Sequence, residues 1–275
     1  MSISIKPLDA PLGAEIGGFD IDALDDATAE EIRQAWYRYQ VLIVRNTRIL
    51  SDDSLVDFGR CFGPIEKARK QSPLASRPEI MVISNIRKDG EVLGVLPDGE
   101  VSFHYDRVHQ EKPNKAGVLH AIEIPARGGD TCFGNMYAAY DALAPAMQRR
   151  LEGLKALNTY DYGATAAGAK RLSEKAPTAV HPVVRTIPET GRKALYVSRL
   201  MTDRILDMPE HESRALLDEL CAHSEQSRFI YRHKWRVGDL LVWDNRCVNH
   251  ARTDFDPSER RLVKRVTVGD TARPL

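Results

Sequence analysis

The stretch "GDLLVWDNRCVNHARTDFDPSERRLVKRVTVGD", residues 238–270, holds two apolar strand patterns separated by polar turns. It opens on a Gly-Asp turn, continues into "LLVWDN", and closes with the strand pattern "RRLVKRVTVGD". Short strands joined by such turns favour antiparallel sheets over a doubly wound parallel fold. Because the second half of the chain is dominated by this arrangement, we expect an antiparallel double-sheet barrel with helices packed outside it.

The rest of the chain adds further strands and a few helices. Apolar residues at helical spacing predict helices near 26–40, 51–62, 135–154 and 208–226. Thr28 and Glu31 have capping-box spacing, and Pro145 begins the second part of the third helix. Strand patterns lie near 41–44, 79–84, 116–125, 194–198 and 228–235. We expect a loop at 87–101 beside "SFHYD", and a lid or mobile loop at 155–180.

Composition excludes several classes of partner. The 275 residues include 39 Lys plus Arg and 39 Asp plus Glu, so the formal net charge of zero favours neither nucleic acid nor an acidic membrane. No apolar run approaches the roughly 18 residues of a membrane span, and the N-terminus does not read as a signal peptide. The cysteines are widely spaced and lack a CxxC motif, which predicts buried thiols and a cytoplasmic location: Cys61, Cys132, Cys221 and Cys247.

The stretch "SFHYD", residues 102–106, places an imidazole and a carboxylate two residues apart. On a strand, His104 and Asp106 would share a face, and Tyr105 would point away. One imidazole and one carboxylate suit divalent iron, manganese or zinc, although a catalytic metal needs a third ligand. An isolated pair of this kind is common by chance, and the alternative is two surface or hydrogen-bonded residues.

The region 238–270 supplies candidates for the missing groups. His250 follows the strand "LLVWDN", and Arg261 and Arg265 come later on one strand face. Two guanidinium groups that point the same way can hold an oxyanion with paired hydrogen bonds. Arginines on a solvated strand face are the alternative. The combination of the upstream pair with His250, Arg261 and Arg265 makes coincidence much less probable.

With these residues in place, the sequence resembles the Fe(II)/2-oxoglutarate-dependent dioxygenases of the taurine dioxygenase and 2,4-dichlorophenoxyacetate dioxygenase group. The similar blocks span nearly the whole chain in order: "LGAEIGGFDI", "YQVLIVRN", "FGRCFGPIE", "HYD", "IPARGGDTCFGNMYAAYDAL", "HPVV", "TGRKALYVS", and the "VWDN", His, Arg, Arg ending. The resemblance implies a double-stranded β-helix (jelly roll) that forms one dioxygenase domain over residues 1–275. It also makes a homo-oligomer plausible.

The resemblance also implies roles for individual residues. His104, Asp106 and His250 would be the facial triad of Fe(II), with sites left open for 2-oxoglutarate and O2. Thr131 and Arg261 match the family residues that bind the far carboxylate of 2-oxoglutarate. Arg265 matches an arginine that in several members faces the acidic group of the primary substrate. The reaction would release succinate and CO2 while it hydroxylates a C–H bond.

The substrate is predicted only by class. Taurine-specific members carry a histidine and a tyrosine after the "FG" turn, whereas this chain has "EKARKQSPL" at 66–74. Lys67, Arg69 and Lys70 there supply either anion contacts or a solvated basic cluster. Arg265 favours a small anionic substrate, with an aryloxyalkanoate-type carboxylate first. A sulfonate, an alkyl sulfate or an amino-acid derivative is the alternative within the same chemistry.

Several other polar residues in the sequence match no metal-binding motif. His109 and His120 are predicted to be structural or surface residues. For His181, in the block "HPVV", the sequence leaves two interpretations open: a residue that lines the pocket and a residue outside it. Arg107 departs from the family pattern and is expected to point away from the metal, although it could reach the pocket. A non-catalytic jelly-roll binding protein is disfavoured by the intact ligand set. A zinc hydrolase leaves the pairing of Thr131 with Arg261 unexplained.

Overall fold

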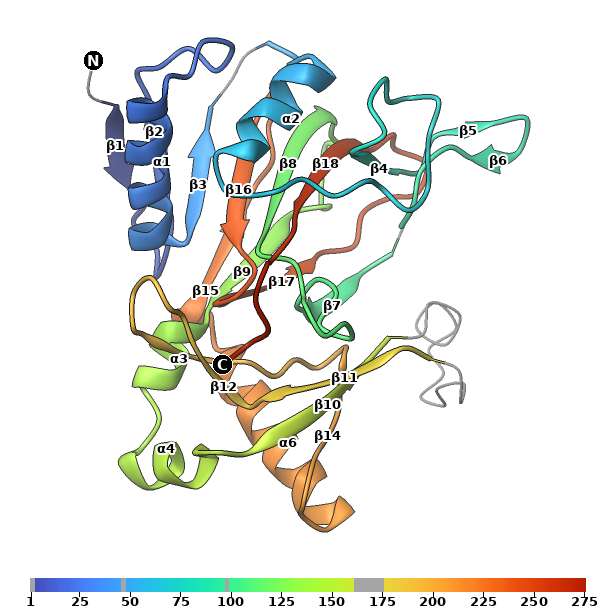
Figure 1. Cartoon of the computed structure of the whole chain (residues 1–275). Helices are drawn as coiled ribbons and strands as arrows, with labels where there is room; N and C mark the ends of the chain where they lie inside the picture. Colours follow the sequence, from blue (N-terminus) through green and yellow to red (C-terminus); the bar gives the residue numbers. More distant parts are fainter. Residues whose placement is uncertain (1–2, 46–47, 97–98, 161–175) are drawn as a thin grey trace.

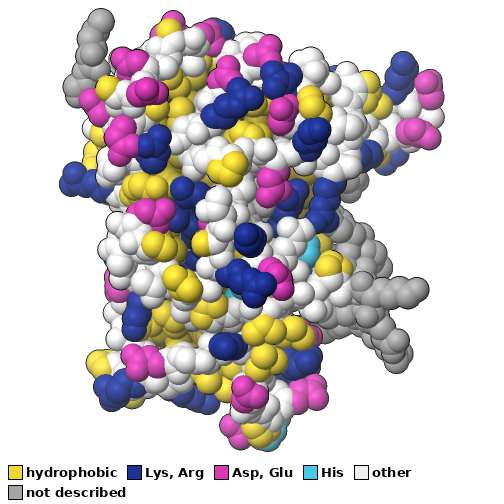
Figure 2. All heavy atoms as spheres, viewed as in Figure 1, with side chains coloured by type: hydrophobic (Ala, Val, Ile, Leu, Met, Phe, Trp, Pro, Cys, Tyr) yellow, Lys and Arg dark blue, Asp and Glu magenta, His cyan; other side chains and the backbone are white. Residues whose placement is uncertain are grey.

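The computed structural model describes residues 3–45, 48–96, 99–160 and 176–275. Strands dominate these ranges, and helices pack around them (Figure 1). The prediction of a mostly β chain with flanking helices is therefore confirmed. Lys and Arg side chains alternate with Asp and Glu over the face drawn in Figure 2, in keeping with the net charge of zero.

The larger sheet has seven strands, and only its β2–β3 pair is parallel. Its strands in spatial order are β1 (Ser4–Pro7), β2 (Ala14–Gly17), β3 (Val41–Val44), β16 (Leu240–Asp244), β8 (Ala116–Glu123), β18 (Leu262–Val268) and β4 (Ile80–Ser84). The two strand patterns of the region 238–270 thus become β16 and β18, which lie on either side of β8.

A second, antiparallel sheet has four strands. They are β15 (Ile230–His233), β9 (Thr131–Asn135), β17 (Val248–Arg252) and β7 (Val101–His104), in that spatial order. The tight turn after β16 leads directly into β17, so the chain passes from the larger sheet to the smaller one within a few residues. This connection brings the β17 residue His250 opposite His104 of β7, with which it is paired in register.

A further group of strands and helices lies below these sheets in Figure 1. It contains β11 (Thr178–Pro182), β10 (Lys155–Thr159) and β14 (Thr202–Ile205) in one sheet, and β12 (Val184–Thr186) with β13 (Lys193–Leu195) in another. The helices here are α3 (Met136–Asp141), α4 (Pro145–Leu151) and α6 (Glu210–Ser224). The short hairpin β5 (Arg87–Lys88) and β6 (Glu91–Val92) projects from the predicted loop 87–101.

Helices α1 (Asp26–Tyr39) and α2 (Asp52–Arg60) cover one face of the larger sheet (Figure 1). The N-cap of α1 is Asp25, whose side chain accepts from the backbone N–H of Thr28, so the predicted cap at Thr28 was wrong by one turn. Ser51 caps α2 in the same way. Each large apolar side chain that these helices bury, such as Trp36, contributes about 1.5–3 kcal/mol.

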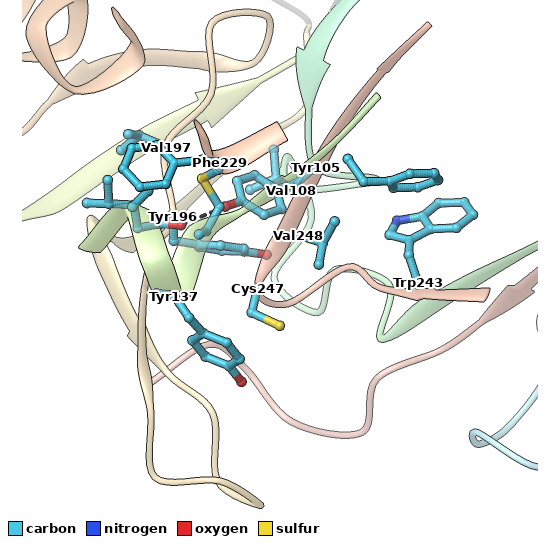
Figure 3. Close-up of a cluster of buried hydrophobic side chains, with 14 of the residues drawn as sticks. Tyr105, Val108, Tyr137, Tyr196, Val197, Phe229, Trp243, Cys247 and Val248 are labelled. Atoms are coloured by element: carbon cyan, nitrogen blue, oxygen red, sulfur yellow. Dashed lines mark hydrogen bonds between the residues drawn. The ribbon is translucent and has the colours of Figure 1, made fainter. Parts of the chain in front are cut away.

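Alternation along β16 divides the interior into two apolar clusters. Leu240 and Val242 join the cluster under α1 and α2, whereas Leu241 and Trp243 join the cluster on the opposite face. That second cluster contains Tyr105, Tyr137, Tyr196 and Cys247 (Figure 3). Tyr105 is fully buried there, and its hydroxyl donates to the carbonyl oxygen of Leu195 at 2.6 Å.

Several predictions fail in their details. Strand β7 ends at His104, so Asp106 lies in the following turn and not on the same strand. Arg107 has a φ of 54°, which breaks strand alternation, and Val108 packs in the apolar cluster instead of pointing toward the metal face. Most of the predicted lid at 155–180 lies outside the described residues. No helix of the described ranges is long and apolar enough to cross a membrane.

Candidate metal centre

Three side chains from two neighbouring strands and a turn converge in the interior. One ligand atom from each of His104, Asp106 and His250 lies within 4.8 Å of the other two. The Asp106 carboxylate is 3.9 Å from Nε2 of His104 and 3.7 Å from Nε2 of His250. The register of β17 against β7 brings the two imidazole rings to a centroid separation of 4.1 Å.

Neighbouring groups fix the orientation of each of these side chains. His104 donates from Nδ1 to the carbonyl oxygen of Ser102 at 2.9 Å, which leaves Nε2 with its lone pair. Asn245 accepts from the Asp106 backbone N–H at 2.8 Å and donates to the Asp106 carbonyl oxygen at 3.1 Å. The Trp243 ring packs on His250 at 4.7 Å. Asn245 therefore holds the Asp106 backbone in place, and Trp243 packs against His250.

The Trp243 ring needs a glycine on the neighbouring strand. Gly117 of β8 is paired with Trp243, and a Cβ atom built on Gly117 would come within 2.1 Å of the indole ring. Only a residue without a side chain allows this close approach. Gly117 thereby permits the indole position against His250.

Electrostatics favour the protonation states that a metal requires. Burial lowers the pKa of His104 and of His250, so both imidazoles are neutral near pH 7. Burial alone would raise the pKa of Asp106, but the charge of Arg265 and its hydrogen bonds to the carboxylate outweigh burial and hold the pKa at about 2. Two neutral imidazoles and one ionised carboxylate are the donor set of a divalent transition-metal site.

Arg265 lies immediately beside the metal-ligand set. Its Nη1 and Nη2 atoms donate to the two carboxylate oxygens of Asp106 at 3.0 and 2.5 Å. The guanidinium group also lies over the Trp243 ring at 5.4 Å. The expected role of Arg265 in binding an acidic substrate stays a prediction, because its terminal nitrogens point at Asp106 in this structure.

Arg261 is a buried cation that forms no ion pair with an acidic side chain in the described part of the chain. It is 3% exposed, its Nη2 donates only to the Gly129 carbonyl oxygen at 3.3 Å, and its Nε has no partner among the described residues. Burial and the nearby charge of Arg252 lower the pKa of Arg261 to about 9. A buried guanidinium of this kind calls for an anion. Thr131 and Arg261 line one internal cavity. The Thr131 hydroxyl accepts a hydrogen bond from Trp235 Nε1 at 3.0 Å.

Two consecutive glycines allow the chain to pass close to Arg261 just before Thr131. Gly128 and Gly129 have φ angles of 74° and 66°, in the left-handed region. A Cβ on Gly128 would meet the Asp254 carbonyl oxygen at 2.2 Å, and one on Gly129 would approach Arg261 Nε at 3.1 Å. The "GGDT" turn therefore fits closely under Arg261 before Thr131 begins β9.

All six predicted site residues line one cavity of about 310 Å³. Its only carboxylate from the described chain is Asp106, a candidate metal ligand. The remaining wall combines cationic groups with apolar side chains, the largest of which include Met81, Ile83, Leu96, Leu119 and Leu200. The cations are Arg69, Lys70, Arg107, Arg252, Arg261 and Arg265.

The three other histidines considered from the sequence differ in whether they line the cavity. His120 is structural as predicted, because its Nε2 accepts from the Leu50 backbone N–H at 3.0 Å. His181 is outside the lining of the cavity and bonds the Gln110 carbonyl oxygen at 2.9 Å. His109 does line the cavity, which the sequence did not predict. Its position three residues after Asp106 indicated that it could lie near the metal centre, but strand alternation does not apply there because the chain forms a turn.

The residues present fit an iron and keto-acid centre. The triad offers two imidazole nitrogens and a carboxylate, and Arg261 with Thr131 offers a receptor for a carboxylate in the same cavity. These features define a non-haem metal oxygenase of the kind that takes an organic acid beside the metal.

The comparisons with known proteins agree with this class. The family model "Taurine catabolism dioxygenase TauD, TfdA family" matches residues 4–267. The chain is 35% identical to pentalenolactone F synthase of Streptomyces arenae, over 94% of this chain and 92% of that protein. It is also 35% identical to the alpha-ketoglutarate-dependent 2,4-dichlorophenoxyacetate dioxygenase of Cupriavidus pinatubonensis, with 99% of each covered. The solved structure of AAD-2 with Mn(II) and N-oxalylglycine is 28% identical, has a TM-score of 0.87, and each chain is 99% covered.

The chain therefore belongs to the TauD/TfdA family of dioxygenases. It is a 2-oxoglutarate-dependent non-haem iron dioxygenase that uses Fe(II), 2-oxoglutarate and O2. The resemblance stated from the sequence is confirmed. The reading as a non-catalytic binding protein has no support from these relatives.

Proposed function

We propose that the enzyme hydroxylates a small organic acid, with an aryloxyalkanoate-type carboxylate as the leading substrate class. The observation that carries the proposal is the unpaired buried guanidinium of Arg261 in the same cavity as the ligand set His104, Asp106 and His250. A keto acid that binds both the metal and Arg261 would explain why these groups share one cavity.

Each side chain has a proposed task. His104, Asp106 and His250 hold Fe(II), which supplies the oxidising chemistry when it is bound with 2-oxoglutarate and O2. Arg261 pairs with the far carboxylate of 2-oxoglutarate, and Thr131 donates a hydrogen bond to that carboxylate. The apolar wall of the cavity excludes water and holds the substrate carbon against the metal.

An anionic substrate with an apolar body suits the composition of the cavity. Six cations and several aliphatic side chains line it, and Asp106 is the only carboxylate from the described chain. Arg265 is a candidate for the acidic group of the substrate, although it would first have to share its bonds with Asp106. Arg69 is a second candidate, because it lies at the same cavity and forms no ion pair with any described residue.

The relatives support the choice of substrate class by name. The relative from Cupriavidus pinatubonensis acts on 2,4-dichlorophenoxyacetate, an aryloxyalkanoate. A sulfonate, an alkyl sulfate or an amino-acid derivative remains the alternative within the same chemistry, since the same cations would bind these anions. We also propose the jelly-roll arrangement of the two sheets and a single domain over residues 1–275. The cytoplasmic location and the homo-oligomer remain predictions from the sequence.

The experiment is a substrate panel read by succinate formation. The enzyme with Fe(II), 2-oxoglutarate and O2 is given phenoxyacetate, hexyl sulfate or taurine. We expect phenoxyacetate to raise succinate release well above the rate without substrate, and His104→Ala to abolish the release. Stimulation by hexyl sulfate or taurine alone would replace the proposed class with the alternative. Full succinate release by His104→Ala would contradict the ligand assignment.

A further inference from the structure

The loop between β7 and β8, residues 105–115, carries two buried polar side chains that neither the metal centre nor the keto-acid site uses. His109 is 6% exposed and Asn114 is 1% exposed. Both line the 310 Å³ cavity that holds the metal-ligand set. The same loop therefore provides Asp106 to the metal centre and two further polar groups to the space around it.

Neither side chain is satisfied within the protein. The Nδ1 atom of His109 and the Oδ1 atom of Asn114 are enclosed, and neither has a hydrogen-bond partner among the described residues. Buried polar atoms in folded proteins nearly always have partners, because an unmade hydrogen bond there costs stability. Two side chains that carry unpartnered polar atoms and line one cavity are candidates for contact with a molecule held there.

Contacts with residues outside the loop hold the loop in place. His181 bonds the carbonyl oxygen of Gln110, the residue after His109, at 2.9 Å. Asn245 donates to the Asn114 carbonyl oxygen at 2.9 Å. The His109 ring stacks on Tyr160 with centroids 5.9 Å apart and an interplanar angle of 24°. These contacts organise the loop before any ligand arrives, as a recognition site requires.

The chemistry of the two groups selects an uncharged partner. Burial and the charges of Arg69 and Arg107 lower the pKa of His109 to about 4, so the ring is neutral near pH 7. A neutral imidazole has one donor and one acceptor, and the Asn114 carboxamide also offers both. A hydroxyl group meets these requirements, because it can donate to Asn114 Oδ1 and can also accept, whereas a carbonyl or carboxylate oxygen cannot donate. A cationic group would be repelled by Arg69 and Arg107, which line the same cavity.

We propose that His109 and Asn114 form a subsite for an uncharged hydroxyl group of the primary substrate. They are specificity-determining residues, and they make the enzyme prefer an organic acid that carries a second oxygen function over an apolar acid of similar size. This inference rests on the proposed function, because it deepens the substrate class of the same cavity.

The test measures binding of matched acids by isothermal titration calorimetry. The full chain is loaded with Mn(II) and 2-oxoglutarate without O2, and phenoxyacetate is compared with its 2-, 3- and 4-hydroxy derivatives. We expect at least one hydroxylated isomer to bind ten times more tightly than phenoxyacetate. His109→Phe keeps a ring for Tyr160, and we expect it to reduce that preference to less than threefold. His109→Gln and Asn114→Leu separate hydrogen bonding from shape, since only the first keeps a polar group.

The possible results are distinguishable. Equal binding of all four acids by the unsubstituted enzyme would overturn the subsite, and this result needs no variant to fold. An equal loss for every acid in His109→Phe, with no recovery in His109→Gln, would also overturn it, because a merely structural ring predicts that pattern. If no acid binds, the proposed substrate class has failed and the subsite is rejected with it. A preference that Asn114→Leu also removes supports the pair.

Discussion

Arg265 donates two hydrogen bonds to Asp106, at 3.0 and 2.5 Å, although Arg265 lies on β18 and Asp106 lies in the turn after β7, 159 positions earlier. The pair is almost completely buried, with Arg265 7% and Asp106 9% exposed. A candidate metal ligand is thus also the ion-pair partner of a buried guanidinium. Arg265 therefore compensates the charge of this buried carboxylate.

Removal of the Arg265 guanidinium should destabilise the protein. We expect Arg265→Gln to lower the free energy of unfolding of the metal-free protein by about 3 kcal/mol, because it leaves Asp106 buried without a cation. Saturating Mn(II) should reduce the loss, since the metal compensates the same charge. Urea unfolding with and without Mn(II) measures both effects. Arg260→Gln is the control, because the Arg260 pair with Glu123 is exposed and should change stability by less than about 0.5 kcal/mol. A loss that Mn(II) leaves unchanged would contradict this account.

Arg261 should behave in the opposite way. It is a buried cation without an acidic partner, so Arg261→Met should leave stability unchanged or raise it. The same substitution should weaken 2-oxoglutarate binding by about 100-fold, because charge-assisted hydrogen bonds to the carboxylate are lost. Thermal unfolding of the free enzyme and calorimetric titration with 2-oxoglutarate test the two halves separately. A destabilised variant with normal 2-oxoglutarate affinity would show that Arg261 is structural.

The buried histidines predict a loss of stability in acid. Six of the eight histidines have pKa values lowered by burial, namely His104, His109, His120, His181, His233 and His250. The unfolded chain binds protons near pH 6.5 whereas the folded chain does not, so stability is retained above that pH and falls below it. We expect the metal-free protein to be less stable at pH 5.5 than at pH 7.5, because unfolding at the lower pH is coupled to proton uptake by these histidines. His211→Gln, at an exposed position, should leave the slope unchanged. Equal stability at the two pH values would refute the prediction.

The contact between Gly117 and Trp243 gives a prediction about packing. Gly117→Ala should destabilise the protein by about 1–3 kcal/mol, because the new methyl group overlaps the indole ring. The displaced ring should also weaken Mn(II) binding, since Trp243 packs against His250. Adding Trp243→Leu should recover part of the stability but not the metal affinity. Additive losses of stability in the double variant would argue against direct contact.

The sequence located the candidate metal ligands better than it described their geometry. Alternation from Arg261 into β18 placed Arg261 and Arg265 on one face, and both line the cavity, whereas Lys264 turns away to Asp52. That inference needs only the period of a strand. The positions of His104 and His250 followed from family resemblance, because periodicity alone does not reveal that β17 pairs with β7.

The parts that could not be predicted depend on turns and on distant partners. The chain leaves strand geometry after His104, so Asp106 reaches the site through two bonds with Asn245 and not through alternation. The same departure carries His109 into the cavity. The pairing of Arg265 with Asp106 joins β18 to a turn that is far from it in the sequence, and no local pattern encodes it.

The central claim is that His104, Asp106 and His250 bind one divalent metal ion. Electron paramagnetic resonance of Mn(II) titrated into the metal-free enzyme measures this directly. We expect one bound Mn(II) per chain, affinity lowered by at least about 100-fold in His250→Ala, and unchanged affinity in His211→Ala. Unaltered Mn(II) binding by His250→Ala would contradict the account.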